Sequence, residues 1–217
     1  MSSKIIYFIR HGETELNALN IRQGPDGPLS QKGREQVLEV AKKFPKIKGR
    51  PEVIISSPFQ RARETSDIIA KELDMSVEYC DLLIERKNPT EIVGHSGKEE
   101  SVAHIVDIID KSFHDDDLRY SDEENFVDLK DRARNLLTYI KKRKESQIIM
   151  VTHGIFLKMI ASYIIFDNKL TSSQYNNLSF LNPMDNAGLT ICKYSSSFFK
   201  KDKWNILVWN NKSKENT

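Results

Sequence analysis

Short apolar runs alternate along the chain with stretches of helical periodicity. Ile5–Ile9 and Ile148–Val151 are continuous apolar runs rich in β-branched residues, a pattern typical of strands that are buried on both faces of a sheet. Further strands are predicted at Val53–Ile55, at Val77–Cys80 as an edge strand, and at Gly188–Tyr194 and Trp204–Trp209 as a final pair. Because helical segments separate most of these strands, the sequence predicts an α/β fold with a mainly parallel sheet.

Three helices are predicted between the strands. Ser30 is an N-cap residue in front of Lys32–Phe44, whose apolar residues share one face, and Pro45 ends that helix. A second helix is expected from about Gln60 to Leu73, and a third, more apolar one from Ile155 to about Ile165.

The region from Glu85 to about Ser146 has a different character. It is polar, shows no clear strand and contains two helical stretches, at about Glu99–Phe113 and Glu123–Arg143. Between them lies the acidic run His114–Asp117, which we interpret as a solvated loop. This region is therefore expected to cover one edge of the sheet.

These elements predict a single domain over residues 1–217. We expect a three-layer sandwich with a mainly parallel central sheet, helices on both faces and a helical cap insertion at about 86–145. A hydrophobic fraction of 39% and a charged fraction of 29% are ordinary for a globular protein. The polar tail Asn210–Thr217 is expected to fray.

Charge and cysteine usage narrow the function classes. The formal net charge of +2 is too small to indicate binding to nucleic acid or to a membrane surface. Cys80 and Cys192 match no metal or redox spacing, and no signal peptide or run of transmembrane length is evident. We therefore expect a soluble, cytoplasmic protein.

Three predicted strands end in residues that can carry chemistry. Arg10-His11-Gly12 follows the first strand, Ser56-Ser57-Pro58 follows the second and leads to Arg61, and Thr152-His153-Gly154 follows the run at Ile148–Val151. The carboxyl ends of parallel strands share one edge of a sheet, so these residues are expected to converge. Their cationic groups would repel unless an anion lay between them, and a phosphoryl group would suit the planar forks of Arg10 and Arg61.

This pattern resembles the histidine phosphatase superfamily, also called the phosphoglycerate mutase-like family, over nearly the whole chain. Each matching stretch alone is a weak signal, whereas five in this order are a strong one. The stretches are Ile9–Thr14 with Asn17; Gln23-Gly24 and Pro28–Ser30 with Gly33; Ser56–Thr65; Leu83–Arg86; and Val151–Gly154.

The resemblance implies a role for each matching residue. His11 would attack phosphorus in line and form a phosphohistidine, while Arg10, Arg61 and His153 would surround the phosphoryl oxygens. Glu85 would protonate the leaving group and then help to activate water. Gly12 would let the backbone approach the nucleophilic ring. The substrate-binding set is completed by Asn17, Gln23, Gly24, Gly154 and Arg86, and the resemblance requires neither a metal nor a cofactor.

Several of these residues also have plainer interpretations. Asn17 can simply cap the turn, and an exposed Glu after a strand, as at Glu85, is common. Arg63 is a weaker candidate than Arg61, which holds the motif position before Ala62. His95, His104 and His114 lack companions at ligand spacing and are treated as surface or cap residues.

The segment after Glu85 favours a phosphatase over a mutase. Mutases of this family usually carry a Glu-Arg-x-Tyr-Gly-like segment, whereas this chain has Pro89-Thr90-Glu91 in place of Tyr-Gly. We expect a metal-independent phosphatase that hydrolyses small phosphomonoesters such as sugar or carboxylate phosphates, with Arg86, Lys87 and Lys98 near a second anionic group. The alternatives are a cofactor-dependent phosphoglycerate mutase and a non-catalytic phosphate- or phosphoprotein-binding module. The expected partner is a small phosphorylated metabolite, and binding to nucleic acid or to a membrane is not expected. Whether the protein forms a homodimer is left open by the sequence.

Overall fold

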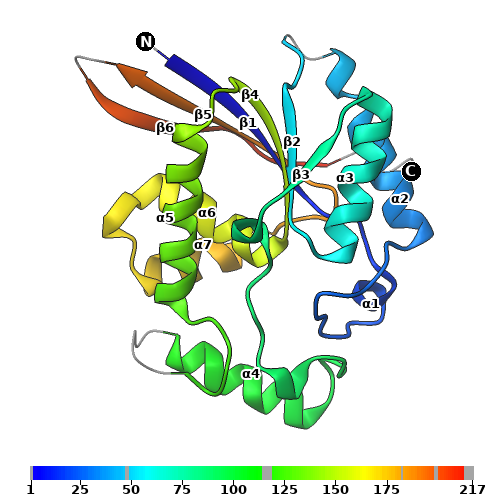
Figure 1. Ribbon diagram of the computed structural model, residues 1–217. Helices are drawn as coiled ribbons and strands as arrows, with labels where there is room; N and C mark the ends of the chain where they lie inside the picture. The colour runs from blue at the N-terminus through cyan, green and yellow to red at the C-terminus, as the bar shows by residue number, and fades with distance from the viewer. Residues whose placement is uncertain (1, 47–48, 114–118, 182, 198–199, 213–217) are drawn as a thin grey trace.

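The computed structural model describes residues 2–46, 49–113, 119–181, 183–197 and 200–212 (Figure 1). One six-stranded sheet lies at its centre, in the order β3-β2-β4-β1-β5-β6. The strands are β1 (Ser2–Arg10), β2 (Val53–Ser56), β3 (Val77–Tyr79), β4 (Gln147–Thr152), β5 (Leu189–Ser197) and β6 (Lys200–Asn211). The helices are α1 (Glu15–Ala18), α2 (Gln31–Ala41), α3 (Gln60–Leu73), α4 (Glu100–Ser112), α5 (Phe126–Lys142), α6 (Gly154–Phe166) and α7 (Ser172–Leu181).

The mainly parallel sheet predicted from the sequence is confirmed. β3, β2, β4 and β1 pair in parallel, whereas β5 runs antiparallel to β1 and β6 antiparallel to β5. The four parallel strands therefore end at one edge, and the antiparallel pair extends the sheet beside β1. All six predicted strands are present.

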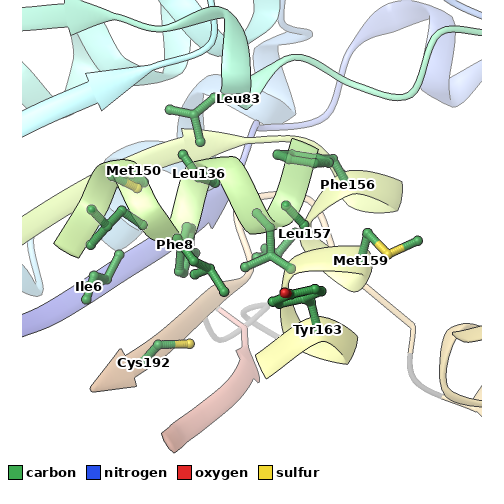
Figure 2. Packing of buried hydrophobic residues seen from close by; sticks show 14 of the residues in the cluster. Ile6, Phe8, Leu83, Leu136, Met150, Phe156, Leu157, Met159, Tyr163 and Cys192 are labelled. Atoms are coloured by element: carbon green, nitrogen blue, oxygen red, sulfur yellow. The ribbon is translucent and has the colours of Figure 1, made fainter. Parts of the chain in front are cut away.

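Helices cover both faces of the sheet, as expected for a three-layer sandwich. β1 shows the period of two: Ile6 and Phe8 belong to one core cluster, Tyr7 and Ile9 to the other, and all four are buried. α5 and α6 pack on the first face, and α2 and α3 on the second (Figure 1). In Figure 2, Leu136 of α5 lies over the strands that carry Phe8 and Met150. Burial on both faces explains why these strands read as continuous apolar runs.

The two helices of the polar region have different positions. α4 lies beyond the carboxyl ends of the parallel strands, at the bottom of Figure 1, whereas α5 is part of the layer that covers the sheet. Of the region 86–145, which the sequence predicts as a cap, the segment that contains α4 lies beyond the strand ends, whereas α5 packs on the sheet. The acidic run His114–Asp117 and the tail beyond Lys212 lie outside the described residues.

Some boundaries differ from the sequence prediction. α2 ends at Ala41, and Phe44–Lys46 forms a separate 3-10 turn that includes Pro45. α1 and α7 were not predicted because one is a single turn and the other is mostly polar. A capping pattern was nevertheless present in front of α7, where Thr171 and Gln174 exchange side-chain hydrogen bonds with each other's backbone N–H.

Replacement of Gly33 tests how tightly the loop after β1 packs on α2. A Cβ at this position would lie 2.0 Å from the carbonyl oxygen of Glu13, which also accepts the Ser30 backbone N–H. Helix propensity alone favours alanine over glycine by about 1 kcal/mol. Because the clash is with fixed backbone, we expect Gly33→Ala to lower the free energy of unfolding by about 1–3 kcal/mol in urea titrations. Glu35→Ala, at an exposed position of the same helix, should change it by less than about 0.5 kcal/mol, and a Gly33 variant as stable as the wild type would contradict the packing.

Candidate active site

The register of the sheet brings the three predicted motifs together. Arg10 pairs with Thr152, and Ser56 pairs with Val151 on the other side of β4. The backbone N–H groups of His11 and Ser57 continue both ladders by donating to the carbonyls of Thr152 and Val151. The first residues beyond β1, β2 and β4 are therefore neighbours at one sheet edge.

His11 is fixed in one tautomer by its two hydrogen bonds. Its ring nitrogen Nδ1 lies 2.7 Å from the carbonyl oxygen of Gly12, which can only accept, so Nδ1 carries the proton. The guanidinium Nε of Arg61 donates to the other nitrogen, Nε2, over 3.3 Å. Nε2 therefore presents a lone pair, and an unprotonated imidazole nitrogen is a competent nucleophile.

The surroundings of His11 and His153 keep both rings neutral. The two ring centroids are 5.1 Å apart, and both residues are buried. Burial lowers the pKa of each histidine well below 6.5, and the charges of Arg61 and Arg10 lower both pKa values further. His153 Nε2 lies 2.8 Å from the Ser57 hydroxyl, and its Nδ1 is buried without a hydrogen-bond partner.

Two arginines border the His11 ring. Burial lowers the pKa of Arg61 to about 10, with Glu85 raising it and Arg10 lowering it. Burial likewise lowers the pKa of Arg10, against the raising effect of Glu85 and Asp185. Arg61 Nη1 donates to the carbonyl of Gly24 over 2.8 Å, whereas Arg10 Nε is buried with no partner. These desolvated cations form a site for an anion.

The glycines of the motifs serve packing. A Cβ at Gly12 would lie 2.6 Å from the carbonyl oxygen of Gly33, so this glycine allows the loop to approach α2. A Cβ at Gly154 would lie 3.2 Å from Arg10 Nε, so Gly154 leaves room for that side chain across the start of α6. The close approach expected at Gly12 is thus made with α2, although its carbonyl also orients the His11 ring.

Glu85 reaches the same edge from the loop that follows β3. Its Oε1 accepts the backbone N–H groups of Arg86 and Phe156 at 2.9 and 3.0 Å, and its Oε2 accepts that of Ile155 at 3.2 Å. Ile155 and Phe156 belong to the first turn of α6, where unpaired N–H groups and the helix dipole favour a carboxylate. Glu85 is therefore held in position by backbone donors.

A cavity of about 260 Å³ opens beside these groups. Seven of the predicted residues line it, namely Arg10, His11, Asn17, Gln23, Arg61, Glu85 and Gly154. Four are not part of the lining, namely Gly12, Gly24, His153 and Arg86, and the Arg86 guanidinium lies 6.0 Å from the centroid of the Phe113 ring. The cavity lining therefore includes both arginines, the nucleophile candidate and the carboxylate.

The plainer interpretations can be placed as well. Asn17 does cap the turn, since it exchanges hydrogen bonds with Thr14 in a capping box, and it also lines the cavity. Arg63 is exposed and stacks 4.9 Å from the ring centroid of Tyr79, away from the cavity. His95 pairs with Glu99 at the surface. His104 is exposed and His114 lies outside the described residues.

Sequence reasoning missed part of the lining. Asn20, Arg22, Asn88, Lys158 and Met184 also border the cavity. Lys158 follows Gly154 by one helical turn, a spacing that the sequence did contain. Met184 had no such signal, because its contribution is a backbone carbonyl that accepts a hydrogen bond from Arg10 Nη1.

Unpaired polar atoms gather around this cavity. Among the described residues, six buried side-chain nitrogen or oxygen atoms lack a hydrogen-bond partner, and the lining residues Arg10, Arg22 and Asn88 supply three of them. Buried polar atoms without partners are rare in folded proteins, so these two donors and one acceptor indicate a polar ligand. The described residues contain no cluster of three or more His, Cys, Asp or Glu side chains arranged for a metal ion. None of the described helices has the length and apolar character needed to span a membrane.

The neutral histidines make stability depend on pH. Below about pH 6.5 the unfolded chain binds protons at His11 and His153 that the folded chain does not bind. The free energy of unfolding therefore decreases as the pH is lowered, by up to about 1.4 kcal/mol per pH unit for each histidine. We expect His11→Asn to flatten this dependence in urea titrations between about pH 7 and pH 5.5 in phosphate-free buffer. His104→Asn, at an exposed position, should leave the slope unchanged. Equal slopes for the wild type and the His11 variant would contradict the neutral state.

Comparisons with known proteins agree with this geometry. The profile of the histidine phosphatase superfamily (branch 1) matches residues 6–212. The chain is 30% identical over 178 residues to the probable phosphoglycerate mutase GpmB of Citrobacter koseri, with 74% of each chain covered. The protein of the same name from Escherichia coli is 29% identical over 170 residues, again with 74% of each chain covered.

Solved structures share the fold. A mycobacterial glucosyl-3-phosphoglycerate phosphatase, solved with VO3, superposes with a TM-score of 0.76 at 23% identity, covering 96% of this chain and 99% of that one. A histidine-to-alanine variant of the phosphoserine phosphatase of Entamoeba histolytica, in complex with phosphoserine, gives a TM-score of 0.73 at 26% identity, covering 95% and 96%. On the match of its sequence over nearly the whole chain, and with the fold and sheet-edge residues described above, this protein belongs to the histidine phosphatase superfamily (branch 1).

Proposed function

We propose that this protein is a phosphatase that hydrolyses small phosphomonoesters through a phosphohistidine on His11. The observation that carries the proposal is the His11 ring itself: its unprotonated Nε2 accepts a hydrogen bond from Arg61, and the residue lines the cavity together with Arg10. A neutral nucleophile beside two fixed cations suits attack on a phosphate ester, because the cations stabilise the negative charge of the transition state.

The reaction has two halves. In the first, His11 Nε2 attacks phosphorus as the ester P–O bond breaks. Glu85, protonated once the bound phosphoryl group replaces it as counter-charge to Arg10 and Arg61, gives its proton to the departing oxygen. Glu85 Oε2 is the oxygen that suits this proton, because it accepts one backbone N–H, from Ile155, whereas Oε1 accepts two. In the second half, Glu85 takes a proton from water, water attacks phosphorus, and the P–N bond breaks to release inorganic phosphate.

A second anionic group on the substrate is supported by Arg22, which lines the cavity, and by its neighbour Arg86 outside the lining. Burial lowers the pKa of Arg22, and the charge of Arg86 lowers it further, while Asp110 raises it. Both Arg22 and Arg86 have a buried Nε without a partner. Lys87 pairs with Asp122 and Lys98 is exposed, so neither supports the role expected for it. We therefore propose sugar or carboxylate phosphates as substrates, and the phosphoserine held by the Entamoeba relative carries a carboxylate of this kind.

A phosphoglycerate mutase is the second candidate, because the curated relatives at about 30% identity bear that name. Against it, Thr90 donates from both its backbone N–H and its hydroxyl to Asp122, so the Pro89-Thr90-Glu91 segment has its own local structure in place of the Tyr-Gly of mutases.

Replacement of His11 tests the proposed intermediate. We expect His11→Ala to lower kcat by about 10⁵-fold or more, because the variant has no nucleophile. Wild-type protein should trap a base-stable, acid-labile phosphoryl label on His11 from a labelled ester, and the variant should trap none. His104→Ala, at an exposed position, serves as the matched control. Identical behaviour of wild type and His11→Ala in every assay would support the non-catalytic binding module instead.

Replacement of Arg22 tests the substrate class. Charge-assisted hydrogen bonds contribute about 1.5–3 kcal/mol, so Arg22→Met should raise KM for phosphoserine by about 10- to 100-fold. KM for phenyl phosphate, which lacks a second anion, should change by less than about 3-fold. Lys98→Met is the control and should behave as the wild type with both esters. Equal effects of Arg22→Met on KM for the two esters would contradict a contact between Arg22 and a second anionic group.

The mutase alternative predicts a different product. Phosphoglycerate incubated with and without a bisphosphate primer should give inorganic phosphate at similar rates if the protein is a phosphatase. Primer-dependent isomerisation without release of phosphate would establish the mutase.

A further inference from the structure

We propose that Arg132 of α5 is a positioning residue for Glu85, acting with Glu124 to hold the segment that presents this carboxylate. The inference rests on the proposed role of Glu85 as proton donor and extends it to a side chain outside the cavity lining.

Glu85 belongs to an irregular segment whose backbone carbonyl groups need hydrogen-bond donors. The segment follows the 3-10 turn Asp81–Leu83 and forms no sheet ladder with a neighbouring strand. Buried carbonyls in such a segment must be satisfied by side chains or water. The Thr152 hydroxyl donates to the carbonyl of Leu83 over 2.8 Å.

Arg132 satisfies the carbonyls on both sides of Leu83. Its Nη1 donates to the carbonyls of Leu82 and Ile84 at 3.3 and 2.7 Å, and its Nη2 donates to that of Glu85 at 3.4 Å. Four consecutive carbonyls, from Leu82 to Glu85, are thus held by two side chains. This arrangement fixes the backbone from which the Glu85 carboxylate projects.

Glu124 fixes Arg132 in turn. Its two carboxylate oxygens accept from Arg132 Nε and Nη2 at 2.8 and 2.6 Å, and Oε2 also accepts the backbone N–H of Lys87 at 2.9 Å. With these bonds all five N–H groups of the guanidinium have partners within the protein. Arg132 therefore has no donor left for a substrate, which identifies it as a positioning residue.

A second contact connects Arg132 with the carboxylate itself. The guanidinium carbon lies 3.9 Å from the ring centroid of Phe156, and the Phe156 backbone N–H donates to Glu85 Oε1. Arg132 consequently contacts both the backbone of Glu85 and a residue that orients its side chain. A lysine would retain the charge but lose the planar fork that makes these contacts simultaneously.

The experiment compares two esters that differ in their need for a proton donor. Phenyl phosphate requires protonation of its leaving oxygen, whereas p-nitrophenyl phosphate releases a stabilised anion. We expect Arg132→Lys to lower kcat/KM for phenyl phosphate by about 10²-fold and for p-nitrophenyl phosphate by less than about 3-fold, because general acid catalysis contributes about 10²- to 10⁴-fold. Glu124→Gln should show the same difference in a smaller degree. Arg134→Lys, an exposed arginine of the same helix, is the matched control.

A double variant separates positioning from a general structural role. In the Glu85→Gln background the effect of Arg132→Lys on phenyl phosphate should vanish, because both changes remove the same proton transfer. The inhibition constant for inorganic phosphate should stay within about 3-fold of the wild type in all variants that retain the fold. Equal losses with both esters, or full additivity with Glu85→Gln, would overturn the inference. Absence of turnover in the wild type would instead contradict the proposed function, so the two failures are distinguishable.

Discussion

The site depends on an uncharged imidazole held beside the guanidinium groups of Arg61, which is buried, and Arg10, which is half-buried. Burial lowers the pKa of His11 well below its ordinary value, and Arg61 and Arg10 lower it further because they would repel a protonated ring. The proton that the ring retains is on Nδ1, facing the carbonyl of Gly12. Nε2 is consequently the unprotonated nitrogen, and its lone pair accepts the Nε–H of Arg61, which lines the cavity with His11. Burial and charge repulsion keep the ring neutral, and the Gly12 carbonyl together with the Arg61 N–H determines its tautomer.

The same cations require a counter-charge, and Glu85 supplies it. Its charge raises the pKa of both Arg10 and Arg61 against the effect of burial. The first turn of α6 binds this carboxylate through two backbone N–H groups, since a helix N-terminus favours negative charge. Glu85 thus balances charge, and from the same position it borders the cavity in which a proton donor would act.

The site residues are positioned by different kinds of contact. The parallel strands place Arg10 and His11 by a hydrogen-bond ladder that extends one residue past β1. Glu85 has no such ladder, and Arg132, Thr152 and Glu124 replace it with side-chain hydrogen bonds. The segment before α5 adds Asn88 to the cavity lining.

The sequence by itself determined the sheet and the residues at its edge. Continuous apolar runs predicted β1 and β4 because a strand buried on both faces has no polar positions, and the motifs after them followed from the rule that parallel strands end together. Tertiary structure alone decided which of these residues reach the cavity. Arg22 lines it whereas His153 and Lys98 do not, because the path of an irregular loop depends on long-range contacts rather than on local periodicity. The pairing of Arg132 with the carbonyls near Glu85 was likewise invisible in the sequence, since it joins backbone groups, which carry no residue signature, across 48 positions of the chain.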